Sequence, residues 1–88
     1  MDKRWVNIFK VLGNINRLKI IKMLASGKIM NVTEISEELD ISFKSTSQHL
    51  VILQKMDLLD SIGKDGHVYY SLDKNIPLDF KRAIKLFC

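Results

Sequence analysis

The chain has 88 residues, 47% of them hydrophobic and 27% charged, which suits one globular domain and leaves no room for a second core. Its one cysteine, Cys88, excludes an internal disulfide and fits a reducing cytoplasm. The polar start and the lack of any run of about 18 apolar residues argue against a signal peptide and a membrane span. We therefore expect a single domain over residues 1–88, located in the cytoplasm and without a membrane partner.

The net charge of +4 is unevenly distributed. Residues 1–30 carry seven Lys or Arg and one Asp, whereas residues 31–60 carry two Lys and six acidic side chains. A positive net charge indicates an anionic partner such as nucleic acid. Because the middle segment is acidic, each chain should have only modest affinity for phosphates, and dimerisation would then strengthen binding.

The first two predicted elements are helices. Residues 3–12 repeat apolar side chains at i, i+3, i+4 and i+7, which predicts one helix, and Gly13 interrupts the pattern. A second helix is predicted over residues 16–25, with Gly27 ending it. Its apolar side chains face more than one direction, which predicts a central position in the fold.

A short third helix and a longer fourth helix follow with a tight link between them. Residues 33–39 form the third helix in this interpretation, with Thr33 as its N-cap. Residues 40–42 make the link, and Ser42 caps a helix that continues to about Met56. A short helix, a tight turn and a longer helix form a helix-turn-helix unit.

The sequence period then changes to alternation. Residues 59–72 alternate apolar and polar side chains around the turn signal GKDG, which predicts a β-hairpin. Pro77 suits a first helical position, and residues 77–87 repeat the helical spacing. The predicted fold is mainly α (α+β), a winged helix-turn-helix with the order α-α-α-α-β-β-α, in which the hairpin is the wing.

The stretch SFKSTSQHLVIL, from Ser42 to Leu53, changes character halfway. A recognition helix contacts DNA with its N-terminal residues, while its far end is anchored in the core. We expect the Leu-Val-Ile-Leu half to face the core, with Thr46, Leu50 and Leu53 inward. The candidate DNA-binding residues are Ser42, Phe43, Lys44, Ser45, Ser47 and Gln48.

Each of these side-chain types has a matching group on DNA. Gln48 can pair with adenine, Lys44 can reach a phosphate or a guanine, and Phe43 can touch a thymine methyl group. The alternative is that Ser and Thr gather here only to cap the helix. Capping accounts for Ser42 and for Ser45, but not for residues beyond the first turn.

The wing offers fewer candidates. Lys64 and His67 flank its tip, and Gly66 allows the backbone to approach a phosphate or a minor groove closely. The alternative interpretation is a solvated turn with incidental charges, which the nearby acidic residues favour.

The two terminal helices, at residues 3–12 and 77–87, both carry bulky apolar faces. Apolar surface that remains after folding marks an interface, and a two-fold dimer places two recognition helices on neighbouring half-sites. In the alternative, both helices only cover the core of the monomer. The candidate dimer-interface residues are Trp5, Ile8, Phe9, Phe80, Ile84 and Phe87.

Catalytic and metal sites are not predicted. His49 and His67 lack partners at metal-ligand spacing, and no glycine-rich phosphate loop follows a strand. No nucleophile is paired with a base and an orienting group. We therefore expect no enzyme activity, no cofactor and no metal.

From about Val11 to Leu72 the sequence resembles the ArsR family of winged-helix repressors. The similar segments are NINRLKIIKMLASGK, EISEELDISFKSTSQHLVILQKMDLL and DGHVYYSL. The resemblance implies a homodimeric DNA-binding transcription regulator that dimerises through its first and last helices. It also implies that residues 43–45, 47 and 48 contact DNA, whereas His49 and Leu50 are mainly structural.

The chain also departs from that family. Metal-sensing members carry Cys-x-Cys at the start of the third helix, where this chain has Asn31 and Thr33, and the last helix has Asp79 but no His. We therefore expect a regulator without metal sensing, acting on double-stranded DNA as a homodimer and as a repressor, with no effector indicated. The alternative is a winged helix that binds proteins and not specific DNA.

Overall fold

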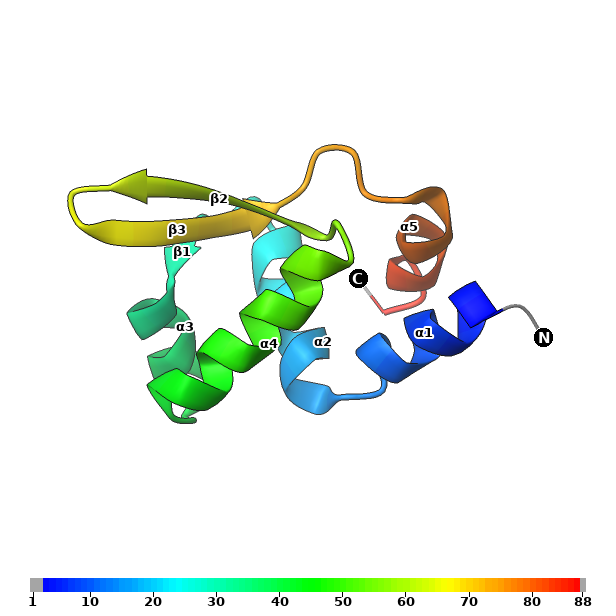
Figure 1. Cartoon of the computed structure of the whole chain (residues 1–88), viewed down its shortest axis with the longest axis horizontal. Coiled ribbons are helices and arrows are strands. Elements are labelled where there is room, and N and C mark those ends of the chain that lie inside the picture. Colours follow the sequence, from blue (N-terminus) through cyan, green and yellow to red (C-terminus); the bar gives the residue numbers. More distant parts are fainter. Residues whose placement is uncertain (1–2, 88) are drawn as a thin grey trace.

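The computed structural model describes residues 3–87, and Cys88 lies outside this range. The helices lie together, and the wing projects at one end of an elongated molecule of 43 × 24 × 20 Å (Figure 1). The predicted fold and element order are confirmed, with one added short strand. The elements are α1 (Lys3–Leu12), α2 (Ile15–Ala25), β1 (Met30–Asn31), α3 (Val32–Leu39), α4 (Phe43–Lys55), β2 (Leu59–Lys64), β3 (His67–Leu72) and α5 (Leu78–Ile84).

Polar side chains fix the start of α2 and join it to α1. Asn14 is the N-cap, and its side-chain oxygen accepts hydrogen bonds from the backbone N–H groups of Asn16 and Arg17, at 3.0 and 3.2 Å. The Arg17 side chain donates to the carbonyl oxygens of Val11 and Lys10, at 2.7 and 3.1 Å. Arg17 therefore satisfies two carbonyl groups at the C-terminal end of α1.

The N-cap of α3 differs from the prediction. Asn31, not Thr33, caps this helix, and Thr33 lies in its first turn. The Asn31 side chain accepts from the Glu34 N–H at 2.8 Å, while the Glu34 carboxylate accepts from the Asn31 N–H at 3.0 Å. This reciprocal capping box satisfies two donors at once, whereas a cap at Thr33 would place a non-acidic residue three positions later.

The link between α3 and α4 is tight, as predicted. Asp40 adopts a left-handed conformation with φ 55°, and its N–H donates to the carbonyls of Glu37 and Ser36. Ser42 then caps α4, its hydroxyl oxygen accepting from the Ser45 N–H at 3.0 Å. The link between the two helices of the helix-turn-helix unit is thus short and is fixed by hydrogen bonds at both ends.

The sheet is antiparallel with the strand order β1-β3-β2. The hairpin pairs Leu59 with Leu72 at its base and Lys64 with His67 at its tip. Asp65 and Gly66 form the turn with φ 52° and 78°, the positive values that a two-residue hairpin turn requires. The strand β1 is the element that was not predicted, and it pairs with Tyr69 and Tyr70 of β3.

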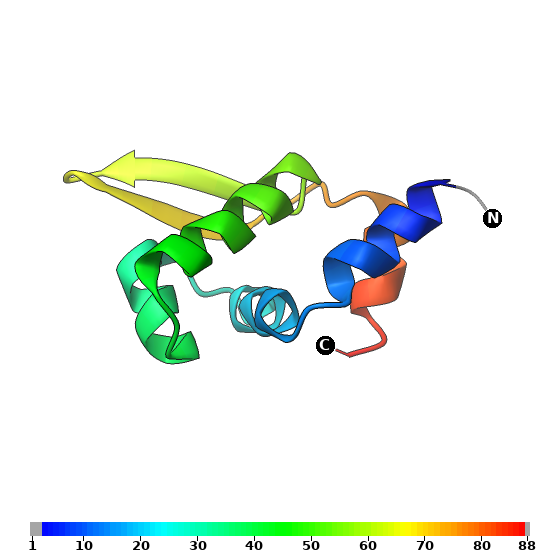
Figure 2. The same ribbon diagram turned by 60° about the horizontal axis from the view of Figure 1, so that its bottom comes forward.

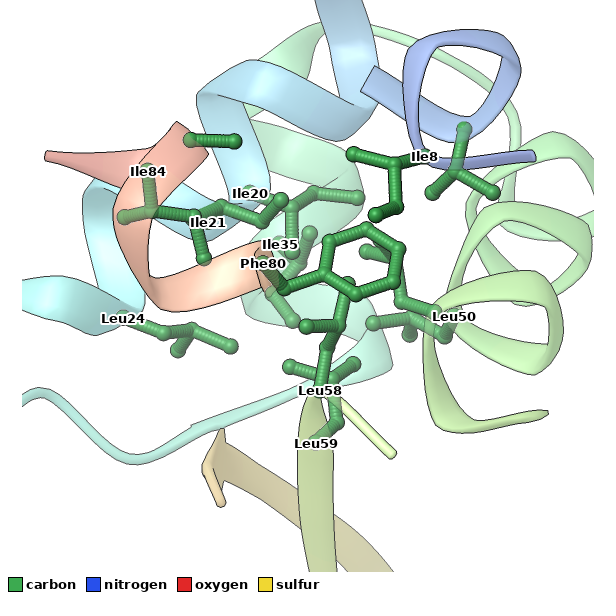
Figure 3. Packing of buried hydrophobic residues seen from close by; sticks show 13 residues of the cluster. Ile8, Ile20, Ile21, Leu24, Ile35, Leu50, Leu58, Leu59, Phe80 and Ile84 are labelled. Carbon is green, nitrogen blue, oxygen red and sulfur yellow. The ribbon is translucent and has the colours of Figure 1, made fainter. Parts of the chain in front are cut away.

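Phe80 of α5 lies at the centre of the core, beside side chains from α1, α4 and the base of the wing (Figure 3). Ile8, Phe80 and Ile84 are buried within the single chain, although we expected them to lie at a dimer interface. For these three residues the alternative applies, because they cover the core of the monomer. Helix α5 begins after Pro77 and ends at Ile84, and tighter i+3 turns carry the chain on to Phe87.

Candidate nucleic-acid interface

Helix α4 is anchored by one buried side. Thr46, Leu50 and Leu53 are fully buried, as predicted. The Thr46 hydroxyl donates to the Ser42 carbonyl at 2.9 Å, so the one buried polar side chain of this side has a partner. The burial of this side leaves the opposite side of the helix in solvent.

A shallow groove runs along the exposed side, which we call the α4 groove. Its residues form two neighbouring rows, and the members of each row are about one helical turn apart, because positions i, i+4 and i+8 lie on the same side of a helix. One row is Phe43, Ser47 and Val51, and the other is Lys44, Gln48 and Ile52.

Four of the six predicted DNA-binding residues of this helix line the α4 groove, and two do not. Ser42 is exposed at the cap, and Ser45 is half-buried beside it with its N–H bound to the Ser42 hydroxyl. The structure therefore brings together Phe43, Lys44, Ser47 and Gln48. The two serines hold the first turn in shape.

Sequence reasoning missed two residues of the groove. Val51 is 48% exposed and Ile52 is 36% exposed, although we expected the Leu-Val-Ile-Leu half to face the core. Only Leu50 and Leu53 do so. The signal was present in the spacing, because the helical period that places Phe43 and Lys44 outward also places positions 51 and 52 outward.

The wing tip lies next to the start of α4 on one side. A hollow of about 200 Å³ is lined by Phe43, by Gly66 and His67 of the tip, and by the first turn of α3. Lys64 instead lines a separate hollow with Ile29, Ile62 and Tyr69. Of the predicted wing residues, Gly66 and His67 thus adjoin the α4 groove, and Lys64 does not share that hollow.

His49 lies at the margin of α4 and is half-buried. Burial, with the nearby charge of Arg17 as a second cause, lowers the pKa of His49 below its usual value. Within residues 3–87 its Nδ1 atom has no hydrogen-bond partner. A neutral, partly buried imidazole is suited to packing and not to binding a phosphate.

Two positions correspond to metal ligands in metal-sensing members of the family that the sequence resembles. In this chain their side chains have other partners. The Asn31 side-chain oxygen is engaged in capping α3, and the Asp79 carboxylate is engaged by Arg4. Among the described residues, no three His, Cys, Asp or Glu side chains gather in a way that could hold a metal ion. No helix in the same range is long and apolar enough to cross a membrane.

Helices α1 and α5 lie side by side at the end of the molecule opposite the wing (Figure 2). Arg4 joins them, with its Nε 2.8 Å from the Asp79 carboxylate and its guanidinium 5.1 Å from the centre of the Phe80 ring. Trp5 and Phe9 are exposed on α1, and their ring centres lie 6.0 Å apart. Together with exposed Val6, Leu78 and Leu86, they leave apolar surface at this end.

Comparisons with known proteins agree with this geometry. The family model described as bacterial regulatory protein, arsR family, matches residues 14–61. The cadmium resistance transcriptional regulatory protein CadC of Listeria innocua is 40% identical over 70 residues, which cover 80% of this chain and 58% of CadC. The transcriptional repressor SdpR of Bacillus subtilis is 34% identical over 73 residues, covering 83% of this chain and 80% of SdpR.

A similar solved structure is reduced HlyU from Vibrio cholerae. It superimposes with a TM-score of 0.78 at 30% identity, covering 96% of this chain and 84% of HlyU. The relatives by sequence are transcriptional regulators and not enzymes. The chain therefore belongs to the ArsR family of winged helix-turn-helix transcriptional regulators.

Proposed function

We propose that this chain is a homodimeric repressor that binds a short, near-palindromic site on double-stranded DNA in the cytoplasm. In this proposal the α4 groove enters the major groove, and the wing lies near the backbone or the minor groove. The observation that carries it is the division of α4 into a fully buried side and an exposed groove beside the wing tip. SdpR, a relative across most of both chains, is named a transcriptional repressor.

The apolar surface at the α1 and α5 end supports the dimer. Trp5 and Phe9 are exposed on α1, and this helix lies at the far end of the long axis from the wing (Figure 1). A two-fold axis at this end would leave both α4 grooves free and would give two equivalent half-site contacts. Dimerisation would also compensate for the single Lys in each groove, since phosphate affinity rises with the number of neutralised phosphates.

The test begins by selecting binding sites from a random duplex library and measuring affinity for the selected site at fixed salt. We expect Gln48→Ala to weaken specific binding by about 1–3 kcal/mol and to relax the preference at one base pair. Lys44→Ala should weaken binding to all sequences and reduce the salt slope by about 1. If both variants bind the selected site as tightly as the parent, the assignment of the groove is wrong.

The matched control for Lys44 is Lys74→Ala, which removes another exposed lysine from the loop between β3 and α5. This variant should keep the affinity and the salt slope of the parent. Thermal unfolding of all variants checks that they remain folded.

A second candidate function is binding of a protein partner through the same groove. Three of its six side chains are apolar, and the neighbouring helix α3 is acidic. The two functions differ in salt dependence. DNA affinity that falls steeply with salt and depends on sequence favours the regulator, whereas weak and sequence-independent DNA binding favours the protein-binding module.

A further inference from the structure

The α4 groove has an unusual balance of side chains for a surface that faces DNA. Its six residues include one charge, on Lys44, and three apolar side chains, Phe43, Val51 and Ile52. Phe43 is 60% exposed and Val51 is 48% exposed, so both are available to a partner. A groove that only anchored phosphates would be expected to carry more basic and hydroxyl groups.

The major groove offers one apolar group to such side chains. This group is the C5 methyl of thymine, the one methyl group that the four base pairs present in the major groove. We infer that Phe43 and Val51 are specificity-determining residues that contact thymine methyl groups in the half-site. This inference rests on the proposed function and adds the chemistry that the groove selects.

The spacing of the two residues fits two bases that lie a few base pairs apart. Phe43 and Val51 are eight positions apart in one row, which corresponds to about 12 Å along the helix axis. At about 3.4 Å per base pair, this distance covers three to four base pairs along the groove. Two thymines at that separation, on either strand, would meet the two side chains.

The remaining groove residues agree with A·T pairs. Gln48 lies in the second row, between Lys44 and Ile52, and its amide can accept and donate to the N6 and N7 edge of adenine. Ser47, between Phe43 and Val51, is small enough to let the bases approach the helix. An A·T pair therefore offers partners to both kinds of side chain. Its adenine can bind the amide, and its thymine methyl can contact an apolar side chain.

The experiment replaces each thymine of the selected site by deoxyuridine, one at a time, which removes only the methyl group. Loss of a buried group of this size should weaken binding about fourfold, equivalent to about 0.8 kcal/mol. We expect at least one thymine in each half-site to show this loss with the parent protein. In the Phe43→Ala and Val51→Ala variants, deoxyuridine at the thymine that the missing side chain contacts should cause no further loss of affinity. The effects of the protein change and of the DNA change on binding free energy should therefore not be additive.

Two further variants make the test specific. Ile62→Ala removes an equally apolar side chain, 62% exposed, from the outer strand of the wing, and it should keep the full sensitivity to deoxyuridine. Val51→Thr keeps the shape of the side chain while replacing a methyl by a hydroxyl, and it should reduce the sensitivity without changing the fold.

Four results would overturn the inference. In the first, the parent binds thymine and deoxyuridine sites equally at every position, and in the second, the sensitivity of binding to deoxyuridine persists in both alanine variants. In the third, Ile62→Ala also abolishes that sensitivity. In the fourth, the alanine variants change the oligomeric state of the free protein. The last result would make the groove an interface between chains. If no sequence is enriched in the selection, the proposed function itself fails, which is distinct from specific binding that ignores the methyl groups.

Discussion

The Arg4 guanidinium contacts the Asp79 carboxylate across 75 positions of the chain, with Nε 2.8 Å from Oδ2. The same guanidinium lies over the Phe80 ring, which is at the centre of the core. The first and last helices are thus held together by an ion pair that is partly open to solvent. Its guanidinium also covers a buried aromatic ring. We therefore expect the α1 and α5 end to be sensitive to acid.

The first prediction concerns pH. The hydrogen bond from Arg4 lowers the pKa of Asp79 in the folded state, so the ionised carboxylate stabilises the fold above the usual carboxyl value of about 3.9. This contribution is lost as pH falls through the lowered value. Asp79→Asn should therefore melt at a lower temperature than the parent at pH 7, and the difference should close as pH falls below about 4.

The control for this prediction is Asp60→Asn, which changes an exposed carboxylate on β2. It should leave the melting temperature nearly unchanged at pH 7 and at pH 3. A parent-to-variant difference for Asp79→Asn that is as large at pH 3 as at pH 7 would contradict the prediction.

The second prediction concerns the cap of α3. Asn31→Ala should lower the free energy of unfolding by about 1 kcal/mol, because the Glu34 N–H loses its acceptor. Thr33→Ala, two positions along, should change it by less than about 0.5 kcal/mol. Urea unfolding measures both, and equal effects of the two variants would argue against Asn31 as the cap.

The third prediction compares two neighbours on α4. Leu50 is fully buried, so Leu50→Ala should cost about 2–5 kcal/mol of folding stability through the cavity it leaves. Val51 is half exposed, and Val51→Ala should cost less than about 1 kcal/mol. The two values come from the same denaturation experiment, and a reversed order would mean that the helix is rotated about its axis.

The fourth prediction separates dimerisation from DNA binding with two similar residues. Phe9 on α1 is 59% exposed and Phe43 on α4 is 60% exposed, at the two ends of the molecule. Phe9→Glu should shift sedimentation toward the monomer, because it places a charge in the apolar surface that we propose as the dimer interface. Phe43→Glu should remain dimeric and lose affinity for the selected DNA site. A dimeric Phe9→Glu variant would show that dimerisation uses another surface.

Local sequence signals predicted much of this fold. Ser42 follows a tight link and precedes a helical pattern, and it caps α4 as expected. The turn at Asp65 and Gly66 joins two alternating stretches, and it closes the hairpin as expected. Such features depend on residues within a few positions of one another, so the sequence carries them directly.

Features that depend on distant partners were predicted less well. Strand β1 has only two residues, too few for an alternating pattern, and it exists because Tyr69 and Tyr70 lie beside it. Ile8, Phe80 and Ile84 have the spacing of any apolar helix face, which does not distinguish a core from an interface. Val51 and Ile52 were missed because an apolar run was taken as buried throughout, whereas a helix turns adjacent residues to different sides.

Asn31 belongs to two elements at once. It ends β1, where it pairs with Tyr69 of the wing, and it caps α3. The wing and the helix-turn-helix unit are therefore joined at a residue that is held by both the strand pairing and the capping box. The surface that we propose for DNA is assembled before any partner arrives, so association loses little conformational entropy in ordering it.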